Sequence, residues 1–201
     1  MKVKRGFSGR LLDRVFSIMP KAAAQLIISW TRFGECRLAT GLRKSAYRRV
    51  LAKMGDDVVI FPGVYIYGPQ FVSIGSRVSI HEFSYINGYA NGTVEIGDCV
   101  LIAAGCRINA AEHRFGIPGV LIRDSGEEYE KIRVGNNVWL GFNVCVLAGT
   151  TVGDSSVIGA GAVVTKNIPS EVVALGVPAR PLRRVYNDPS SPAAGAEAVL
   201  L

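Results

Sequence analysis

An aliphatic residue recurs at every sixth position through much of this 201-residue chain, and this spacing restricts the fold more than any other feature of the sequence. The strictest run has six consecutive members: Val134, Leu140, Val146, Val152, Ile158 and Val164. Shorter runs with the same spacing contain Ile74, Ile80 and Ile86, then Ile96, Ile102 and Ile108, with weaker matches at Ile60, Ile66 and Val72. The pattern predicts one repeating structure that begins near Asp56.

A period of six fits neither the 3.6-residue turn of an α-helix nor a plain two-residue alternation. Because six is a multiple of two, it keeps the aliphatic residues on one face of short strands. Three hexads then form one triangular coil, and successive coils stack about 4.8 Å apart. Glycine often follows the aliphatic residue, and we expect it to permit corner dihedrals that a Cβ would obstruct. These glycines are Gly135, Gly141, Gly153 and Gly159. The periodicity therefore predicts an all-β solenoid without fixing its handedness.

Two interruptions of the rhythm predict surface loops, where functional residues concentrate. One spans residues 87–95, and the longer one spans residues 113–131. His113, one of only two histidines, stands where the longer loop leaves the solenoid. The other histidine, His81, follows the core residue Ile80 at a corner, so we expect a structural role for it.

The positive charge of the chain is concentrated in its first 54 residues. They contain thirteen lysines and arginines against two acidic residues, Asp13 and Glu35, which is a net charge of +11, whereas the remainder carries −4. We predict that residues 1–55 form helices, interrupted at Pro20, that cap the open end of the solenoid. A basic amphipathic helix is also typical of proteins that contact an anionic membrane surface. Nucleic acid is not an expected partner, because no recognised binding motif accompanies the charge.

Helical spacing assigns faces to this segment. The inward face of the first helix is predicted to contain Phe7, Leu11, Leu12, Val15, Ile18 and Met19, opposite Arg10 and Arg14. The inward face of a later helix contains Leu42, Tyr47, Val50, Leu51 and Met54, opposite Arg43, Lys44, Arg48, Arg49 and Lys53.

The cellular setting is read from three further features. The apolar run 22–30 is shorter than the roughly 20 residues that a membrane span needs, and no secretory cleavage site closes it. The four cysteines lack paired spacing, which favours reduced thiols. We expect a cytoplasmic protein, with residues 186–201 as a flexible tail.

The segment IRVGNNVWLGFNVCVLAGTTVGDSSVIGAGAVVTKNIPSEVVALGVPARPLRRV closely resembles the closing coils of the hexapeptide-repeat acyltransferases. It is most similar to the galactoside and maltose acetyltransferases and to relatives that acetylate sugars in polysaccharide pathways. The resemblance covers roughly residues 56–185. It implies a left-handed parallel β-helix, a homotrimer, active sites between neighbouring subunits, and acetyl-CoA as the acyl donor.

The resemblance also assigns roles to individual residues. His113 matches the general base, and Asn87 and Trp139 match residues that contact the acceptor. The positions that match the CoA groove are Trp139, Gly141, Phe142, Ala160, Thr165, Lys166, Arg180 and Arg183. Asn87 either bonds an acceptor hydroxyl or stabilises its own turn. The chain departs from the family at Phe142, which replaces a small polar residue, and no acceptor-side lid is recognisable in the N-terminal segment.

The chemistry that these assignments imply is simple. A thioester is reactive, so catalysis needs positioning, a base for the acceptor proton, and donors for the developing oxyanion. Imidazole, with a pKa near 6.5, is a suitable base. We expect a backbone N–H near Gly141 or Phe142 as the oxyanion donor. Glu112 adjoins His113, but consecutive strand residues point to opposite faces, so it is expected in solvent.

The sequence therefore predicts an acetyl-CoA-dependent O-acetyltransferase that acts directly on a sugar hydroxyl, in surface polysaccharide or glycolipid synthesis. Transfer to the nitrogen of an amino sugar is an alternative, and so is a β-helix without catalytic activity. The family's carbonic-anhydrase-like members bind zinc through three histidines from two subunits. This chain has two histidines in all, so no metal is expected.

Overall fold

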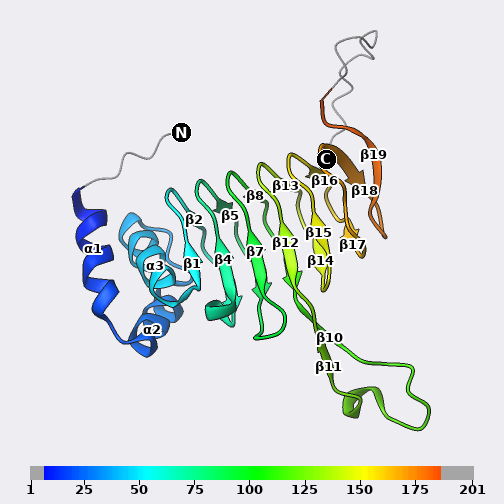
Figure 1. Cartoon of the computed structure of the whole chain (residues 1–201). Coiled ribbons are helices and arrows are strands. Elements are labelled where there is room, and N and C mark those ends of the chain that lie inside the picture. The colour runs from blue at the N-terminus through cyan, green and yellow to red at the C-terminus, as the bar shows by residue number, and fades with distance from the viewer. Residues whose placement is uncertain (1–6, 187–201) are drawn as a thin grey trace.

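The chain winds through three parallel β-sheets in turn (Figure 1). The computed structural model describes residues 7–186 of the chain. Sheet A consists of β1 (Lys53–Met54), β4 (Val72–Ile74), β7 (Val94–Ile96), β12 (Ile132–Val134) and β15 (Thr151–Val152). Sheet B consists of β2 (Val59–Ile60), β5 (Ser79–Ile80), β8 (Leu101–Ile102), β13 (Trp139–Leu140), β16 (Val157–Ile158), β18 (Val172–Leu175) and β19 (Arg180–Arg184), the last being antiparallel to β18. Sheet C consists of β3 (Tyr65–Tyr67), β6 (Tyr85–Asn87), β9 (Arg107–Asn109), β14 (Cys145–Leu147) and β17 (Val163–Val164).

The core is the column of hexad aliphatics inside this three-sided winding. In sheet A, Ile74 pairs with Ile96, Ile96 with Val134, and Val134 with Val152, so equivalent residues stack from coil to coil. Every aliphatic residue of the hexad runs is buried. The winding begins earlier than the sequence predicted, because β1 already pairs with β4 at Lys53.

Three helices cover the first coil, as the blue end of Figure 1 shows: α1 (Phe7–Ile18), α2 (Lys21–Thr31) and α3 (Arg37–Val50). Among the described residues, no helix is long and apolar enough to cross a membrane. Tyr47 and Val50 of α3 are buried in the same core cluster as the hexad aliphatics. Residues 187–201, which make up almost all of the expected tail, lie outside the described residues.

The predicted inward face of α1 is confirmed at Leu12 and Met19, which pack against the core, and wrong at Val15 and Ile18. Val15 and Ile18 were expected inside, yet they are 49% and 86% exposed. Phe16, at 3% exposure, is the residue that packs into the core, together with the partly buried Leu12 and Met19. These three residues are spaced four and three apart, which also satisfies helical periodicity, so the sequence pattern alone did not discriminate between the two faces. The side chains of Phe7 and Leu11 lie outside the described residues.

Arg43 was expected on the solvent side of α3, but it is fully buried. Its guanidinium donates hydrogen bonds to the carbonyls of Ile60 at 3.0 Å, Thr31 at 2.5 Å and Gly34 at 3.1 Å. Burial lowers the pKa of this guanidinium. Carbonyls at a helix C-terminus lack intrahelical partners, and Arg43 satisfies the last carbonyl of α2. The side chain therefore ties α2 and α3 to the first coil.

The glycine that follows each hexad aliphatic has a different role from the one predicted. None of Gly135, Gly141, Gly153 and Gly159 has a positive φ. At the corner between sheets A and B, positive φ belongs instead to the residue two places later, such as Cys99 or Asn137. A Cβ on Gly97 would lie 2.7 Å from the Gly135 carbonyl oxygen and 2.6 Å from the Asn136 Oδ1. The glycine is needed because the next coil passes too close for a side chain.

We predict that Gly97→Ala lowers the free energy of unfolding by about 1–3 kcal/mol, because its Cβ cannot be placed without moving the backbone of the next coil. Gly41→Ala is the matched control. A Cβ at Gly41, inside α3, meets only Leu12 Cδ1 at an ordinary 3.8 Å, so helix propensity should raise stability by about 0.5–1 kcal/mol. Urea unfolding monitored by circular dichroism measures both changes, and equal stability of the Gly97 variant and the parent would contradict this account.

Every insertion into the winding occurs at one edge, where the chain passes from sheet C to sheet A. Between β3 and β4 lies the 3₁₀ turn η1 (Pro69–Phe71), and between β6 and β7 lie residues 88–93. Between β9 and β12 the chain forms a hairpin of β10 (Ala111–His113) and β11 (Glu127–Tyr129), with η2 (Ile122–Asp124) near its tip. Figure 1 shows this hairpin, which we call the arm, projecting away from the coils. We call the shared edge the insertion corner.

Candidate active site

His113 is the last residue of β10, at the stem of the arm. The antiparallel register places it opposite Glu127 of β11. His113 Nε2 lies 3.8 Å from Glu127 Oε1, and the histidine side chain is 61% exposed. A carboxylate at this position can orient the ring and stabilise the imidazolium that forms when the ring accepts a proton.

Glu127 also accepts a hydrogen bond from the hydroxyl of Tyr129. This bond to the carboxylate is the main reason why the pKa of Tyr129 is raised to about 12. The hydroxyl is therefore protonated at neutral pH, and it donates the hydrogen bond that holds the Glu127 carboxylate in place. Glu112 pairs across the hairpin with Glu128, and it is exposed as expected. The carboxylate beside the imidazole is thus Glu127, which the sequence did not single out.

Asn87 ends β6 at the insertion corner and is buried. Its Nδ2 donates to Asn109 Oδ1 at 2.7 Å, and Asn109 in turn donates to the Ala111 carbonyl at the start of β10. Within the described chain, the buried Asn87 Oδ1 accepts no hydrogen bond. The amide therefore supports the base of the arm through its nitrogen and leaves its oxygen for a donor from outside the chain.

A row of tyrosines connects this corner to the first coil. The rings of Tyr67 and Tyr89 are 5.7 Å apart, and those of Tyr89 and Tyr129 are 4.6 Å apart. On sheet C, Tyr65 and Tyr85 are stacked at 5.8 Å, and the guanidinium carbon of Arg32 lies 4.5 Å above the Tyr65 ring. Aromatic faces of this kind are suited to ring-shaped, partly apolar ligands.

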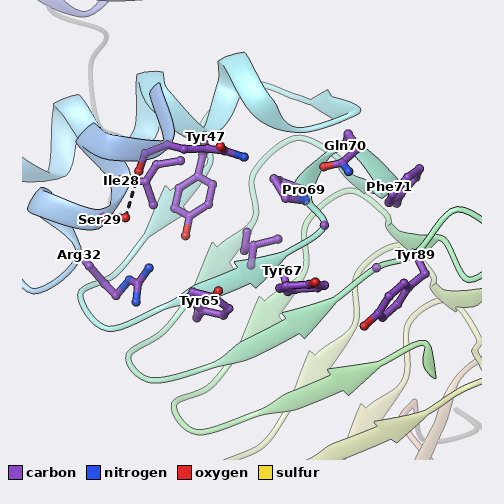
Figure 2. Close-up of a pocket in the computed structure, with 14 residues that line it drawn as sticks. Ile28, Ser29, Arg32, Tyr47, Tyr65, Tyr67, Pro69, Gln70, Phe71 and Tyr89 are labelled. Carbon is purple, nitrogen blue, oxygen red and sulfur yellow. Dashed lines mark hydrogen bonds between the residues drawn. The ribbon is translucent and has the colours of Figure 1, made fainter. Parts of the chain in front are cut away.

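A groove of about 440 Å³ opens between α2, the first coil and the insertion corner. Figure 2 shows Ser29 and Arg32 of α2 on one side, with Tyr65, Tyr67 and Tyr89 on the other. Because Tyr89 also contacts Tyr129, whose hydroxyl bonds Glu127, the groove is connected to His113 through side-chain contacts. Its size suits an organic ligand of moderate size.

The positions assigned to the CoA groove are distributed over two regions of the chain. Trp139 lies on sheet B, between Leu101 and Val157 in register, and is 40% exposed, as its outward position predicted. Gly141, Phe142 and Ala160 follow β13 and β16 at the corner between sheets B and C. In a three-sided winding, sheet B is the face opposite the insertion corner. One chain therefore places Trp139 and His113 on opposite sides of the winding.

One predicted oxyanion donor is excluded. The Gly141 N–H donates to the Ile158 carbonyl at 2.8 Å, because it belongs to the sheet ladder between coils. A Cβ at Gly141 would lie 2.7 Å from the Ala160 nitrogen, so this residue is also needed for close packing. Of the two expected donors, only the N–H of the exposed Phe142 remains.

The other assigned residues are all exposed. Thr165 and Lys166 follow β17 at the insertion corner, two coils beyond the start of the arm. Arg180 and Arg183 belong to β19, and their guanidinium groups donate to the carbonyls of Ala179 and Arg184. Those bonds leave other guanidinium N–H groups for phosphate oxygens.

His81 and the cysteines take structural positions. The His81 ring stacks on Phe61 with centroids 4.3 Å apart. Cys106 is buried and donates to the Gly141 carbonyl, and burial raises the pKa of its thiol to about 11. All four cysteines are unpaired. A thiol with this pKa is a poor nucleophile at neutral pH.

Sequence reasoning missed both Glu127 and the tyrosine row. The spacing carried a signal for the tyrosines, because Tyr65 and Tyr85 occupy the same outward position in consecutive coils. Glu127 had no comparable signal, since its proximity to His113 depends on the register of the hairpin.

The family model described as bacterial transferase hexapeptide (six repeats) matches residues 131–166. The chain is 39% identical over 148 residues to a galactoside O-acetyltransferase of Escherichia coli (strain K12), an alignment that covers 71% of this chain and 68% of that protein. A solved structure of a galactoside acetyltransferase in complex with coenzyme A superposes with a TM-score of 0.72 at 30% identity, covering 92% of this chain and 86% of the other. A maltose O-acetyltransferase from Clostridium difficile 630 superposes with a TM-score of 0.72 at 25% identity, covering 83% and 87%.

Proposed function

This chain belongs to the hexapeptide-repeat acetyltransferases, and we propose on that premise that it transfers an acetyl group from acetyl-CoA to a hydroxyl group of a sugar. It is an acyltransferase that uses acetyl-CoA as the donor. The observation that carries the proposal for the acceptor is the insertion corner. There His113 is connected to the tyrosine-lined groove through the side chains of Glu127, Tyr129 and Tyr89. Asn87, whose side-chain oxygen is unsatisfied, ends β6 at the same corner.

The proposed reaction is a single direct transfer. Asn87 Oδ1 accepts a hydrogen bond from a hydroxyl of the acceptor, and His113 removes the proton of the attacking hydroxyl. The hydroxyl oxygen forms a bond to the thioester carbonyl carbon, and the bond from that carbon to sulfur breaks. The imidazolium, stabilised by Glu127, returns its proton to the departing thiolate of CoA.

We propose that the complete site forms between neighbouring subunits of a homotrimer of left-handed β-helices. His113 and Asn87 of one subunit would face sheet B of the next, which supplies Trp139 and the backbone N–H of Phe142. The opposite placement of these two groups in one chain supports this arrangement, because a base must reach the proton that it abstracts. A closed ring of identical subunits provides such a contact at every interface.

The donor is proposed to lie along Gly141, Phe142 and Ala160, with its phosphates near the basic residues. Lys166 offers a flexible point charge, and Arg180 and Arg183 offer planar guanidinium groups that match phosphate oxygens. Thr165 can donate through its hydroxyl. Exposure of all four side chains supports this assignment.

The test of the proposed function is acetyl transfer from radiolabelled acetyl-CoA to a panel of neutral sugars, amino sugars and glycosides. We expect labelled O-acetyl esters, which mild alkali releases as acetate, whereas an amide formed on an amino sugar survives that treatment. No transfer to any acceptor would support a non-catalytic role and refute the proposal. Rapid-quench trapping of labelled acetyl on the protein would refute direct transfer.

The proposed setting is surface polysaccharide or glycolipid synthesis at the cytoplasmic side of a membrane. The tyrosine-lined groove, which we call the acceptor groove, supports a saccharide acceptor, and so do the sugar acetyltransferases of the family. The basic N-terminal segment supports a location where anionic surfaces are near.

A further inference from the structure

Helix α2 carries a row of large apolar side chains that nothing within the described chain covers. Leu26 and Trp30 are 64% and 88% exposed, and their spacing of four residues places them along one side of the helix. Phe33, in the turn that follows the helix, is 67% exposed. Ile18, at the end of α1, and Leu38, in the first turn of α3, are 86% and 66% exposed. We call these five residues the α2 stripe. Single exposed apolar residues are ordinary, but several large ones within one helical segment indicate an interaction surface.

The other sides of α2 already have partners. Ala24 and Ile28 are buried in the core of the domain. Gln25, Ser29 and Arg32 line the acceptor groove, and Figure 2 shows Ser29 and Arg32 on the side of the helix that faces the tyrosines. The helix therefore presents one side to the core, one to the groove and one, the α2 stripe, to the outside.

The charge around the stripe favours an anionic partner. Arg14, Lys21 and Arg37 are exposed in the same helical segment. Of the two acidic residues among the first 54, Asp13 accepts a hydrogen bond from Ser45 and lies 3.6 Å from Arg48, so its charge is compensated. The other, Glu35, is exposed between α2 and α3, where the three exposed basic residues outnumber it. A second copy that presented the same segment would bring two strongly basic surfaces together. An anionic surface neutralises them instead.

We propose that the α2 stripe inserts into the interface of a membrane that contains anionic phospholipids, with the surrounding lysines and arginines at the level of the headgroups. An amphipathic helix with apolar residues on one side and basic residues at its margins lies in the interface plane in this way. The groove on the adjacent side of α2 then opens beside the bilayer surface, where a lipid-linked sugar presents its saccharide. This inference goes beyond acetyl transfer, because binding to lipid needs neither acetyl-CoA nor an acceptor.

The test is sedimentation of the full chain with sucrose-loaded vesicles of phosphatidylglycerol and phosphatidylcholine in equal amounts. We expect the parent to co-sediment at low salt and to bind phosphatidylcholine vesicles much less. The double variant Leu26→Ser/Trp30→Ser should reduce the partition coefficient at least about tenfold, because it removes apolar area from the inserted face. Phe115→Ser/Leu121→Ser is the matched control. It removes two side chains of similar exposure, 76% and 67%, from the arm, and binding should not change.

Two further measurements separate the outcomes. The Leu26→Ser/Trp30→Ser variant should keep the parent's mass by light scattering and its activity toward a soluble sugar, since neither residue lines the groove. A parent that ignores anionic vesicles, together with a variant that loses subunits, would identify the stripe as a contact between copies and overturn the inference. Vesicle binding by a chain that acetylates nothing would instead refute the proposed function and leave this inference standing.

Discussion

Replacement of His113 by alanine is expected to lower kcat by about 10²–10⁴-fold, the usual contribution of a general base, while KM for acetyl-CoA changes less than about twofold. The imidazole is 61% exposed and belongs to a projecting hairpin, so its removal creates no cavity in the core. The loss should therefore appear in turnover and not in the midpoint of urea unfolding. Steady-state kinetics with both substrates varied, on protein with a parent-like circular dichroism spectrum, measures it.

Two neighbouring carboxylates supply the comparison for His113→Ala. Glu127→Gln should lower kcat by roughly tenfold, because the imidazolium loses the negative charge that faces it at 3.8 Å. Glu112→Gln is the matched control, since that residue adjoins His113 but pairs with Glu128, and kcat should stay at the parent's value. A folded His113→Ala variant with undiminished turnover would remove the histidine from the mechanism.

The winding itself could be predicted because hexad burial is a local property. Each aliphatic residue from Ile60 to Val164 in the runs is inside, since the alternation of a strand fixes which side chains face the core. The two interruptions in the hexads predicted loops at residues 87–95 and 113–131. The structure has a loop at residues 88–93 and an arm that already begins at Ala111. The sequence alone did not show that all insertions share one corner. The order of strands in the sheets places that corner where the chain passes from sheet C to sheet A.

The features that sequence reasoning missed depend on contacts between segments that are distant in the chain. Arg43 was assigned to solvent because a charged residue opposite an apolar face is usually exposed. Its burial depends on the end of α2 and on the first coil, which supply carbonyls at 2.5–3.1 Å. The role of Gly97 likewise depends on the path of the following coil, which a single hexad does not reveal.

The candidate site was half predictable for a related reason. The resemblance located His113 and Trp139 but not their relation within one chain. Trp139 belongs to sheet B, where it pairs with Leu101 and Val157. His113 belongs to the arm, which leaves the winding at the insertion corner on the opposite side. A base and a residue that contacts the same bound substrates must lie near each other, so their separation within one chain makes the subunit arrangement a direct prediction of the proposed mechanism.

Mixed trimers are therefore expected to regain activity that neither parent trimer has. We expect Trp139→Ala trimers to retain about a tenth of wild-type turnover, since an aromatic contact contributes up to about 1.4 kcal/mol, and His113→Ala trimers to be nearly inactive. Unfolding the two variants together in equal amounts and refolding them assorts the subunits at random. If each site takes His113 from one subunit and Trp139 from the next, about a quarter of the sites combine two intact residues, and turnover rises to about a quarter of wild type.

If one subunit carried a complete site, the mixture would show only the average of its parents, about a twentieth. Refolding each variant alone controls for recovery, and mixing without unfolding should give the average, because the subunits then stay in their original trimers.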